Sequence, residues 1–552
     1  MSLGFFRPSS LLRDTAPKLS STASDIILED ERYYARRVYF TATPAPTANV
    51  LDDGALLPGG PVALMSPAFV GLVLQNVGIG VMSGMLASVS GPLYRQYLGV
   101  AGYQAAMYDT VVNLAWYSKV PLAILSDCVP MFGARRKPYM LLGWAIAGLA
   151  SLALSLHDFP DAQRRNATMP ADASHDTTVC FLLTLVTSVG VVLAVVAVDG
   201  AMVHCAQREG MDVRGRAQSV LYCARSLARS LPAAFCGVFL NSAAYGGSFT
   251  FAAGPAVPYV VLTWVSCLGV VTTLLFVVEP EFPQSVTLAG YALSAWRLPQ
   301  RLVVAQICVF RYATEASFRF GAPTDLAAQL APAPSAATAF GAIASPLVYA
   351  TPWAVWALWG VNWCWRAAFA AATVAWIAIN AGATLLVLYG VTTSGATGLL
   401  GTLFEEAPLA VRALTASFSA VELADFGNEA LVYCFVTTWA NLGVATGTLL
   451  SYILAPDADW AMPARADERS KMVTAYVLGL VVKLAGLALL GLLPAQKHDV
   501  QVLKMLNRTH LVLGASFLGA LVLVGVLLFV LSALPLFGSA GGLPYAGRTP
   551  AM

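Results

Sequence analysis

Charged side chains recur at four-residue spacing inside stretches that are otherwise apolar. Arg225 and Arg229 are one such pair, and Arg311, Glu315 and Arg319 form a plus–minus–plus series. Residues four apart lie on the same face of an α-helix. Two arginines on one face could clamp a carboxylate through paired hydrogen bonds, which lysine matches less well. The spacing therefore indicates an anion-binding surface built on helices.

Two further ionisable residues, Lys119 and Asp199, lie in apolar stretches. A charge at the centre of a membrane helix costs about 2.5–3.5 kcal/mol on insertion scales, so a retained one usually faces a cavity or a partner. We assign substrate binding to these residues: Arg225, Arg229, Asp199, Arg311, Glu315 and Lys119. Either Asp199 or Glu315 would carry a coupled proton. The alternative is that they only neutralise one another, as an Asp199–Arg225 pair and an Arg311–Glu315 pair would.

The composition is that of a membrane protein. Of the 552 residues, 58% are hydrophobic and only 11% are charged, whereas soluble domains carry roughly 25% charged residues. The missing charge implies that most of the surface contacts membrane lipid. A net charge of +2 is too small to indicate a nucleic-acid partner.

Several classes of protein are excluded by what the sequence lacks. The nine cysteines contain no CxxC pair, and the five histidines lack metal-binding spacing. Neither a Ser/His/Asp constellation nor a glycine-rich phosphate loop can be placed. We therefore predict no enzyme activity, no metal and no cofactor. The first residues also lack the continuous apolar core of a secretory signal, which predicts a cytosolic tail.

Apolar stretches long enough to cross a bilayer, about 20 residues each, recur along the whole chain. The first group covers 68–92, 104–126, 138–157, 179–203, 217–241 and 257–278. The second covers 301–320, 366–391, 408–423, 430–454, 472–493 and 511–534. A further candidate, 338–361, contains Pro346 and Pro352, so the total is twelve or thirteen. These stretches predict an all-α, polytopic membrane protein.

The same stretches divide the chain into expected regions. We expect a cytosolic tail (1–67), a first bundle (68–278), a cytosolic linker (279–300), a second bundle (301–493) and a final region with one more membrane helix (494–552). The bias of lysine and arginine among the loops places the N-terminus inside. The sequon at Asn166 then falls on an outside loop, where we expect glycosylation.

A short polar hairpin between two apolar stretches, SDCVPMFGARRKPYM at 126–140, concentrates charge in a turn that contains proline and glycine. Asp127 can pair with Arg135, with Arg136 or with the end of a neighbouring helix. Such contacts would hold two helix bundles together on the inside when the binding site opens outward. The alternative is that the cations only enforce topology by the positive-inside rule.

The hairpin resembles a motif of the folate–biopterin transporter family, a branch of the major facilitator superfamily. The matching residues are Asp127, Pro130, Gly133, Arg135, Arg136, Pro138 and Tyr139. VDGAMVHCAQREGMDVRGRAQS, with Arg214, is similar to the family's acidic helix exit closed by Arg-Gly-Arg. ELADFGNEALVYCFVTTWANLG is similar to its entry into a late core helix through Gly427, Glu429 and Tyr433. The final region is similar to an extended version of the family found in oomycete-like eukaryotes.

The resemblance implies a two-bundle major facilitator fold of 12 core helices plus an extra C-terminal helix. It also implies a small-molecule substrate, namely folate, biopterin or a related pteridine, moved by alternating access, with proton symport as the expected coupling. We expect a monomer in the plasma membrane, with an organelle membrane as the alternative. Carriage of another small charged metabolite, a sugar or an amino acid stays open, as does a receptor or scaffold that no longer transports.

Overall fold

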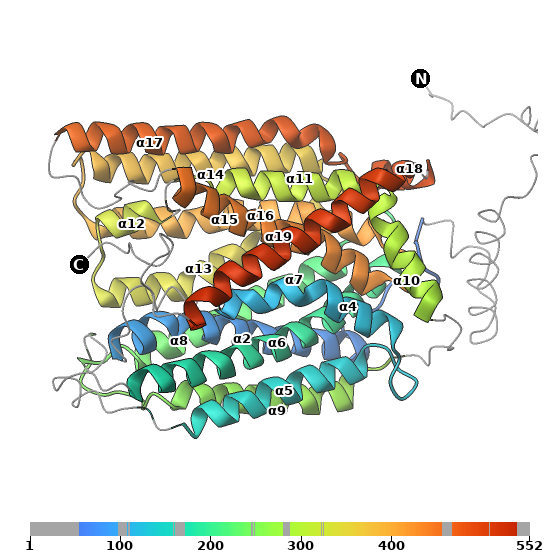
Figure 1. Cartoon of the computed structure of the whole chain (residues 1–552), viewed down its shortest axis with the longest axis horizontal. Helices are drawn as coiled ribbons and strands as arrows, with labels where there is room; N and C mark the ends of the chain where they lie inside the picture. Colours follow the sequence, from blue (N-terminus) through green and yellow to red (C-terminus); the bar gives the residue numbers. More distant parts are fainter. Residues whose placement is uncertain are drawn as a thin grey trace, which may run out of the picture. The chain divides into compact units, whose positions relative to one another are not determined.

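The computed structural model describes residues 54–97, 108, 111–157, 159, 172–243, 247, 249–279, 288–321, 323, 325–454, 466–506 and 508–537. These residues form helices and, among them, no strand (Figure 1). Seven of the described helices are long and apolar enough to cross a membrane. The predicted glycosylation site Asn166 lies outside the described residues. The prediction of an all-α polytopic fold is confirmed.

The first bundle is formed by the helices that precede residue 280. Element labels follow Figure 1. Its α-helices are α2 (Pro67–Ser88), α4 (Lys119–Cys128), α5 (Lys137–Ser155), α6 (Asp172–Gln207), α7 (Arg216–Ala228), α8 (Ser230–Phe239) and α9 (Val257–Phe276). Two short helical turns, η2 (Ser90–Tyr97) and η3 (Ala115–Ser118), lie between α2 and α4. Helix α5 packs on α6 and α9, while α2 packs on α7 and α9.

The second bundle follows a connecting helix, α10 (Leu288–Arg297), and a short turn, η6 (Leu298–Gln300). Its elements are α11 (Leu302–Arg319), α12 (Leu326–Leu330), α13 (Ser335–Val355), η7 (Trp356–Gly360), α14 (Trp365–Leu388), α15 (Gly395–Leu423), α16 (Glu429–Leu454), α17 (Ala466–Ala485) and η8 (Gly486–Leu492). Helix α11 packs on α16, and α15 packs on α13 and α14. Two more helices follow, α18 (Lys497–Met505) and α19 (Leu511–Phe537).

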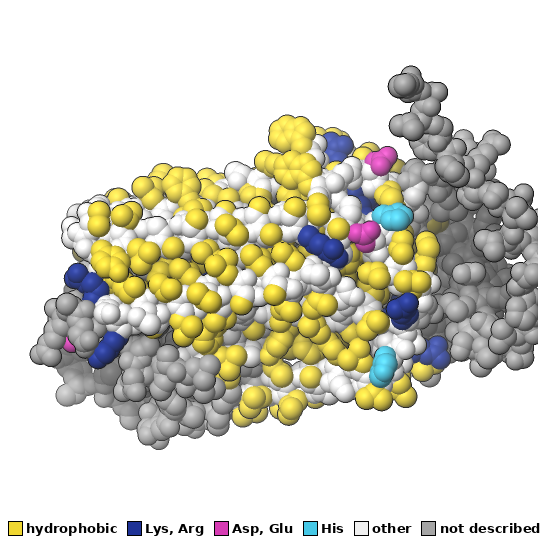
Figure 2. All heavy atoms as spheres, turned by 90° about the horizontal axis from the view of Figure 1, so that it is seen from above, with side chains coloured by type: hydrophobic (Ala, Val, Ile, Leu, Met, Phe, Trp, Pro, Cys, Tyr) yellow, Lys and Arg dark blue, Asp and Glu magenta, His cyan; other side chains and the backbone are white. Residues whose placement is uncertain are grey.

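Two seams join the bundles. At one seam α13 packs against α7 and α8, and at the other α16 packs against α4 and α6. We call the end of the molecule that carries the 129–136 hairpin the hairpin side. Figure 2 shows one face on which apolar side chains predominate and charged side chains are sparse and lie mainly toward the ends. A wide apolar surface of this kind suits a lipid environment.

The helix predicted at 217–241 is divided into α7 and α8, and the division falls at Arg229. The N–H of Arg229 bonds the carbonyl of Ser226 at 3.1 Å, which tightens this turn. Pro232 has no N–H to donate to the carbonyl of Ala228, so the regular hydrogen-bond ladder cannot continue there. The stretch predicted at 217–241 is therefore two helices, with the break next to a proline.

The helix predicted at 408–423 begins thirteen residues earlier, at Gly395, and contains Pro408. Its start is capped by the Oγ of Ser394, which accepts from the N–H of Ala396 at 3.3 Å. The expected start at the proline was therefore wrong. The proline-containing candidate at 338–361 is a helix over Ser335–Val355, because membrane helices tolerate proline when neighbours satisfy the freed carbonyls.

The C-terminal helix α19 is attached to the start of the second bundle. The N–H of Leu302 donates to the carbonyl of Arg508 and the N–H of His510 donates to the carbonyl of Gln300, both at 2.9 Å. Further along, Phe517 meets Trp439 of α16 edge to face, with 5.2 Å between ring centres. Figure 1 shows α19 crossing the other helices obliquely.

Candidate functional site

The first bundle holds a buried ion pair. Arg225 on α7 donates from Nη2 to Oδ1 of Asp199 on α6 at 2.7 Å, and from Nε to Oδ1 of Asn76 on α2 at 2.8 Å. Asp199 and Asn76 are both fully buried. The second carboxylate oxygen of Asp199, Oδ2, has no hydrogen-bond partner among the described residues. One acceptor in this cluster is therefore available to another donor.

Gly80 permits this arrangement. A Cβ atom at Gly80 would overlap the backbone carbonyl of Arg225, so any side chain there would push α2 away from α7. Asn76 lies one turn before Gly80 on the same helix face. The glycine therefore brings Asn76 within hydrogen-bond distance of the guanidinium group.

Tyr222 extends this cluster to the second bundle. Its hydroxyl lies 2.7 Å from the hydroxyl of Tyr433 on α16. Its ring stacks on Trp353 of α13, with 4.9 Å between centres and 18° between planes. The guanidinium of Arg225 lies over the same ring at 4.6 Å, within the range of a cation–π contact. The ion pair therefore lies where the two bundles meet.

The second bundle holds a cluster of two arginines and one acid. Glu315 on α11 lies 3.5 Å from Arg311 on the same helix and 3.7 Å from Arg412 on α15. Among the described residues, neither Nη1 of Arg311 nor Nη2 of Arg412 has a hydrogen-bond partner, although both atoms are buried. These are the two nitrogens that face Glu315, so two guanidinium groups share one carboxylate at ion-pair distance without a hydrogen bond.

Aromatic rings hold the guanidinium of Arg412 in place. It lies 4.0 Å from the ring centre of Phe318 and 4.4 Å from that of Phe369. It also donates to the hydroxyl of Thr373. Contacts on several sides fix its position before any ligand arrives, which lowers the cost of binding.

Two predicted binding residues lie apart from these clusters. Lys119 is 5% exposed, and its ammonium lies 4.7 Å from the ring centre of Trp116. Arg229 is exposed at the junction of α7 and α8, close enough to Glu406 on α15 for its charge to act there. Arg225 and Arg229 thus have different surroundings despite their helical spacing.

The motif hairpin is a tight turn. Met131 and Ala134 exchange backbone hydrogen bonds of 2.9 and 3.1 Å. Gly133 adopts φ +77°, a conformation that favours glycine, and Phe132 adopts φ +55°. Pro138 lies in the first turn of α5, and Tyr139 donates to the carbonyl of Val129 at 2.9 Å. Pro130 lies between the end of α4 and the turn.

The charged residues of the hairpin cross to the second bundle. Arg136 lies 2.8 Å from Glu429 and 3.1 Å from Asp127. Arg135 lies 3.2 Å from Asp127 and donates to the carbonyl of Gly427 at 2.6 Å. Asp127 also accepts from the backbone N–H of Leu431 at 2.8 Å. These contacts join α4 and α5 to the start of α16.

Glu279 supports the hairpin from the end of the first bundle. Its carboxylate accepts from the backbone N–H groups of Arg135, Arg136 and Lys137 at 2.8–3.0 Å. These N–H groups begin α5, where an acid is favoured by the helix dipole. Sequence reasoning missed this role, because Glu279 lies more than 140 positions away in a segment expected to be a linker.

A second bridge on the hairpin side joins the second family motif, through Arg214, to the third, through Glu422. Arg214, after α6, donates to both oxygens of Glu422 at the end of α15, at 3.0 and 2.8 Å. Gln501 of α18 also donates to Glu422 at 2.6 Å. Lys497 of α18 donates to the carbonyl of Met211 at 2.9 Å. Helix α18 therefore contacts both bundles.

Glu209 lies beneath this bridge, in the loop between α6 and α7, and is 5% exposed. Its carboxylate accepts from the N–H groups of Gly215 and Ala217 at 2.8 and 2.9 Å. Burial raises the pKa of Glu209 to about 7, and the two hydrogen bonds oppose that shift only in part.

We expect the stability of the protein to depend on pH through Glu209. Its folded pKa lies above its ordinary value of 4.5, so the stabilisation is complete below pH 4.5 and is lost as the pH rises through about 7. The loss is on the order of 3 kcal/mol by linkage. The Tm of the wild type in detergent should therefore fall relative to that of Glu209→Gln between about pH 5 and about pH 8. Parallel curves would contradict the assignment.

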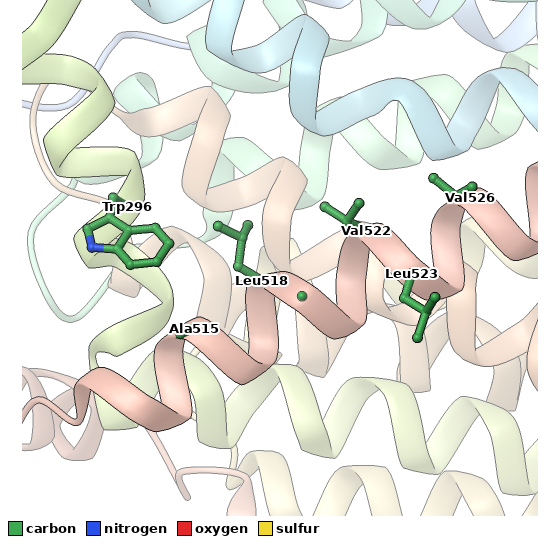
Figure 3. A pocket seen from close by; sticks show the side chains of 7 residues that line it. Trp296, Ala515, Leu518, Val522, Leu523 and Val526 are labelled. Carbon is green, nitrogen blue, oxygen red and sulfur yellow. The ribbon is translucent and has the colours of Figure 1, made fainter.

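An apolar groove lies apart from the charged clusters. It has a volume of about 510 Å³ and lies between α10 and α19 (Figure 3). Its lining residues are Trp296, Ala515, Leu518, Gly519, Val522, Leu523 and Val526. No charged residue lines it, so it does not contribute to the candidate site.

Solved transporter structures share this fold. The chain is similar to a D-xylose–proton symporter, with 13% identity and a TM-score of 0.56 over 78% of this chain and 98% of that one. It is similar to a major facilitator proton:xylose symporter bound to 6-bromo-6-deoxy-D-glucose, with 11% identity and a TM-score of 0.53 over 80% and 98%. The human organic anion transporter TETRAN gives 14% identity and a TM-score of 0.50 over 77% and 98%. The chain therefore has the same fold as these transporter structures.

The family comparison covers the first bundle and the start of the second. Residues 80–312 match the model of the BT1 family. The resemblance to folate–biopterin transporters, predicted from the hairpin, is therefore confirmed for this part of the chain. No curated protein matches the sequence.

Proposed function

We propose that the protein carries folate, biopterin or a related pteridine across a membrane by alternating access between its two bundles. The match of residues 80–312 to the BT1 family supports this substrate class. The carried solute would bind between the bundles, near the midplane, as in other carriers built from two halves. We propose the plasma membrane as its location.

The observation that carries the proposal is the shared carboxylate of the second bundle. Nη1 of Arg311 and Nη2 of Arg412 face the single carboxylate of Glu315 at 3.5 and 3.7 Å, and neither nitrogen has a hydrogen-bond partner in the part of the chain that the structure describes. Folates present glutamate carboxylates at one end. A carboxylate could accept from both arginines in the fork geometry that guanidinium groups favour.

The first bundle supplies groups that suit the flat pterin ring. The unpartnered Oδ2 of Asp199 could accept a hydrogen bond from the ring's amino group. Tyr222 and Trp353 offer aromatic surfaces at the seam between the bundles. Protonation of Asp199 or Glu315 would weaken its pairing with arginine. The sequence analysis assigns the coupled proton to one of these two acids for this reason.

Uptake into proteoliposomes tests this function. Radiolabelled folate, biopterin, S-adenosylmethionine and glucose should be compared with and without a proton gradient. We expect the wild type to take up a pteridine. Uptake by Arg311→Gln should be at least about tenfold lower, because a tenfold loss of affinity corresponds to only about 1.4 kcal/mol of binding free energy.

Arg297→Gln is the matched control. This arginine is exposed on α10, outside both charged clusters, so its removal should leave uptake unchanged. Glucose uptake without pteridine uptake would overturn the substrate class, and wild-type uptake by Arg311→Gln would overturn the binding role of the second bundle.

A further inference from the structure

Glu405 is a buried acid that neither the family motifs nor the proposed binding clusters use. It lies on α15 and is 5% exposed. Helix α15 begins at Gly395, so Glu405 lies about 15 Å along a helix about 43 Å long. The side chain is therefore buried in the interior of a long helix, more than two turns from its start.

The hydrogen-bond partners of Glu405 are neutral. Asn380 on α14 donates from Nδ2 to Glu405 Oε1 at 2.9 Å. Tyr476 on α17 donates to Asn380 Oδ1 at 2.7 Å. The three side chains link α14, α15 and α17 in a row. Asn380 and Tyr476 are both 2% exposed, so bulk water does not surround this row.

No lysine, arginine or histidine lies within 4.0 Å of Glu405 among the described residues. By contrast, other acids of the bundles have arginine partners: Asp127, Asp199, Glu315 and Glu429. Lys483, on the same helix as Tyr476, donates instead to the carbonyl of Phe320 at 2.6 Å. Glu405 therefore lacks the arginine partner that these four acids have.

The charged groups around Glu405 are themselves acidic. Glu406 follows it on α15 and binds Ser345 of α13 at 2.8 Å, and Asp325 lies just before α12. Both act electrostatically on Glu405, and like charges disfavour a second ionised carboxylate. An isolated carboxylate buried from water is costly, and such a group usually neutralises by binding a proton.

We propose that Glu405 holds a proton in the state seen here and releases it during the transport cycle, so that it, rather than Asp199 or Glu315, couples transport to a proton gradient. This inference rests on the proposed transport function. The step is a simple ionisation: the O–H bond of the carboxyl breaks, the electron pair stays on oxygen, and the proton passes to water. Return of the bundle to this dry arrangement requires that the carboxylate bind a proton again.

Infrared difference spectroscopy tests the proton directly and needs no substrate. Because Glu209 is also partly protonated at neutral pH, the measurement uses the Glu209→Gln background. That protein should show the C=O band of a buried protonated carboxyl, and adding Glu405→Gln should remove it. Asp212→Asn, which removes an exposed acid in the loop after α6, is the control and should retain the band. An unchanged band in Glu405→Gln would overturn the inference.

Proteoliposomes test the coupling with two assays. Exchange of labelled for unlabelled pteridine needs no net proton movement, whereas accumulation under an inward proton gradient does. Glu405→Gln should retain exchange and lose accumulation at least about tenfold. Glu405→Asp keeps an ionisable group and should retain both, which separates loss of the proton from loss of the fold.

The outcomes separate the inference from the proposed function. A wild type that exchanges pteridine but ignores the gradient would overturn the role of Glu405 and leave the substrate class intact. Accumulation by Glu405→Gln at the wild-type level would overturn it as well. The carboxyl band, by contrast, would support the protonated state whichever solute is carried.

Discussion

Arg225→Lys should abolish most transport while leaving the protein folded. Lysine retains a positive charge near Asp199 but cannot donate to Asp199 and Asn76 in the fixed fork that Arg225 uses. We expect uptake to fall by at least about tenfold, and the apparent affinity for substrate to fall with it. Initial uptake rates at several substrate concentrations, normalised to abundance at the membrane, measure the effect.

Arg225→Ala should have a different effect, because it leaves Asp199 buried without its cation. Breaking a buried ion pair on one side costs about 3–5 kcal/mol, so the abundance of folded protein should fall. Arg216→Lys is the control, because Arg216 is exposed at the start of the same helix. Normal uptake and affinity in Arg225→Lys would mean that the pair only neutralises charge.

Glu429→Gln should open the hairpin side. Glu429 accepts from Arg136 at 2.8 Å and lies 3.5 Å from Arg135, and it connects both arginines of the first bundle to α16. When Glu429 loses its charge, the two buried guanidinium groups keep Asp127 as their remaining ion-pair partner among the described residues. The cost of about 3–5 kcal/mol for an unbalanced buried charge exceeds the roughly 1.4 kcal/mol that shifts a two-state population tenfold.

Hydrogen–deuterium exchange measures this opening. The N–H of Leu431 is bonded to Asp127 across the seam, so a peptide that covers it should exchange at least about tenfold faster in Glu429→Gln. Lys137→Gln is the matched control. Lys137 belongs to the same motif, but among the described residues its side chain donates to the carbonyls of Leu274 and Val277 in the first bundle. Equal exchange in all three proteins would show that the hairpin cations act in topology alone.

The hairpin was predictable because its parts are close in sequence. Asp127, Gly133 and Arg136 lie within ten positions, and the turn that brings them together is dictated by local backbone preferences. Glu429 was singled out as part of another family motif, but its contact with the hairpin arginines was not predicted. The membrane helices were predictable for the same reason, since each requires only a local run of apolar residues.

The rest of the candidate site depends on which helices face each other, which local patterns do not reveal. Asn76 is one polar residue among many, and only the close approach at Gly80 brings it to Arg225. Glu405 was assigned to no helix, because α15 was expected to begin at Pro408. Its isolation from cations became visible only when α14 and α17 were placed beside it.

The attachment of α19 gives the second bundle a contact with the surrounding lipid that differs from that of the first bundle. Its main contacts are with η6, α11 and α16, all in or next to the second bundle. If the bundles rock against each other, α19 must travel with that half and sweep through the surrounding acyl chains. The thickness and stiffness of the bilayer would then act on the second bundle through α19. The membrane would thus contribute to the free-energy barrier of the conformational change.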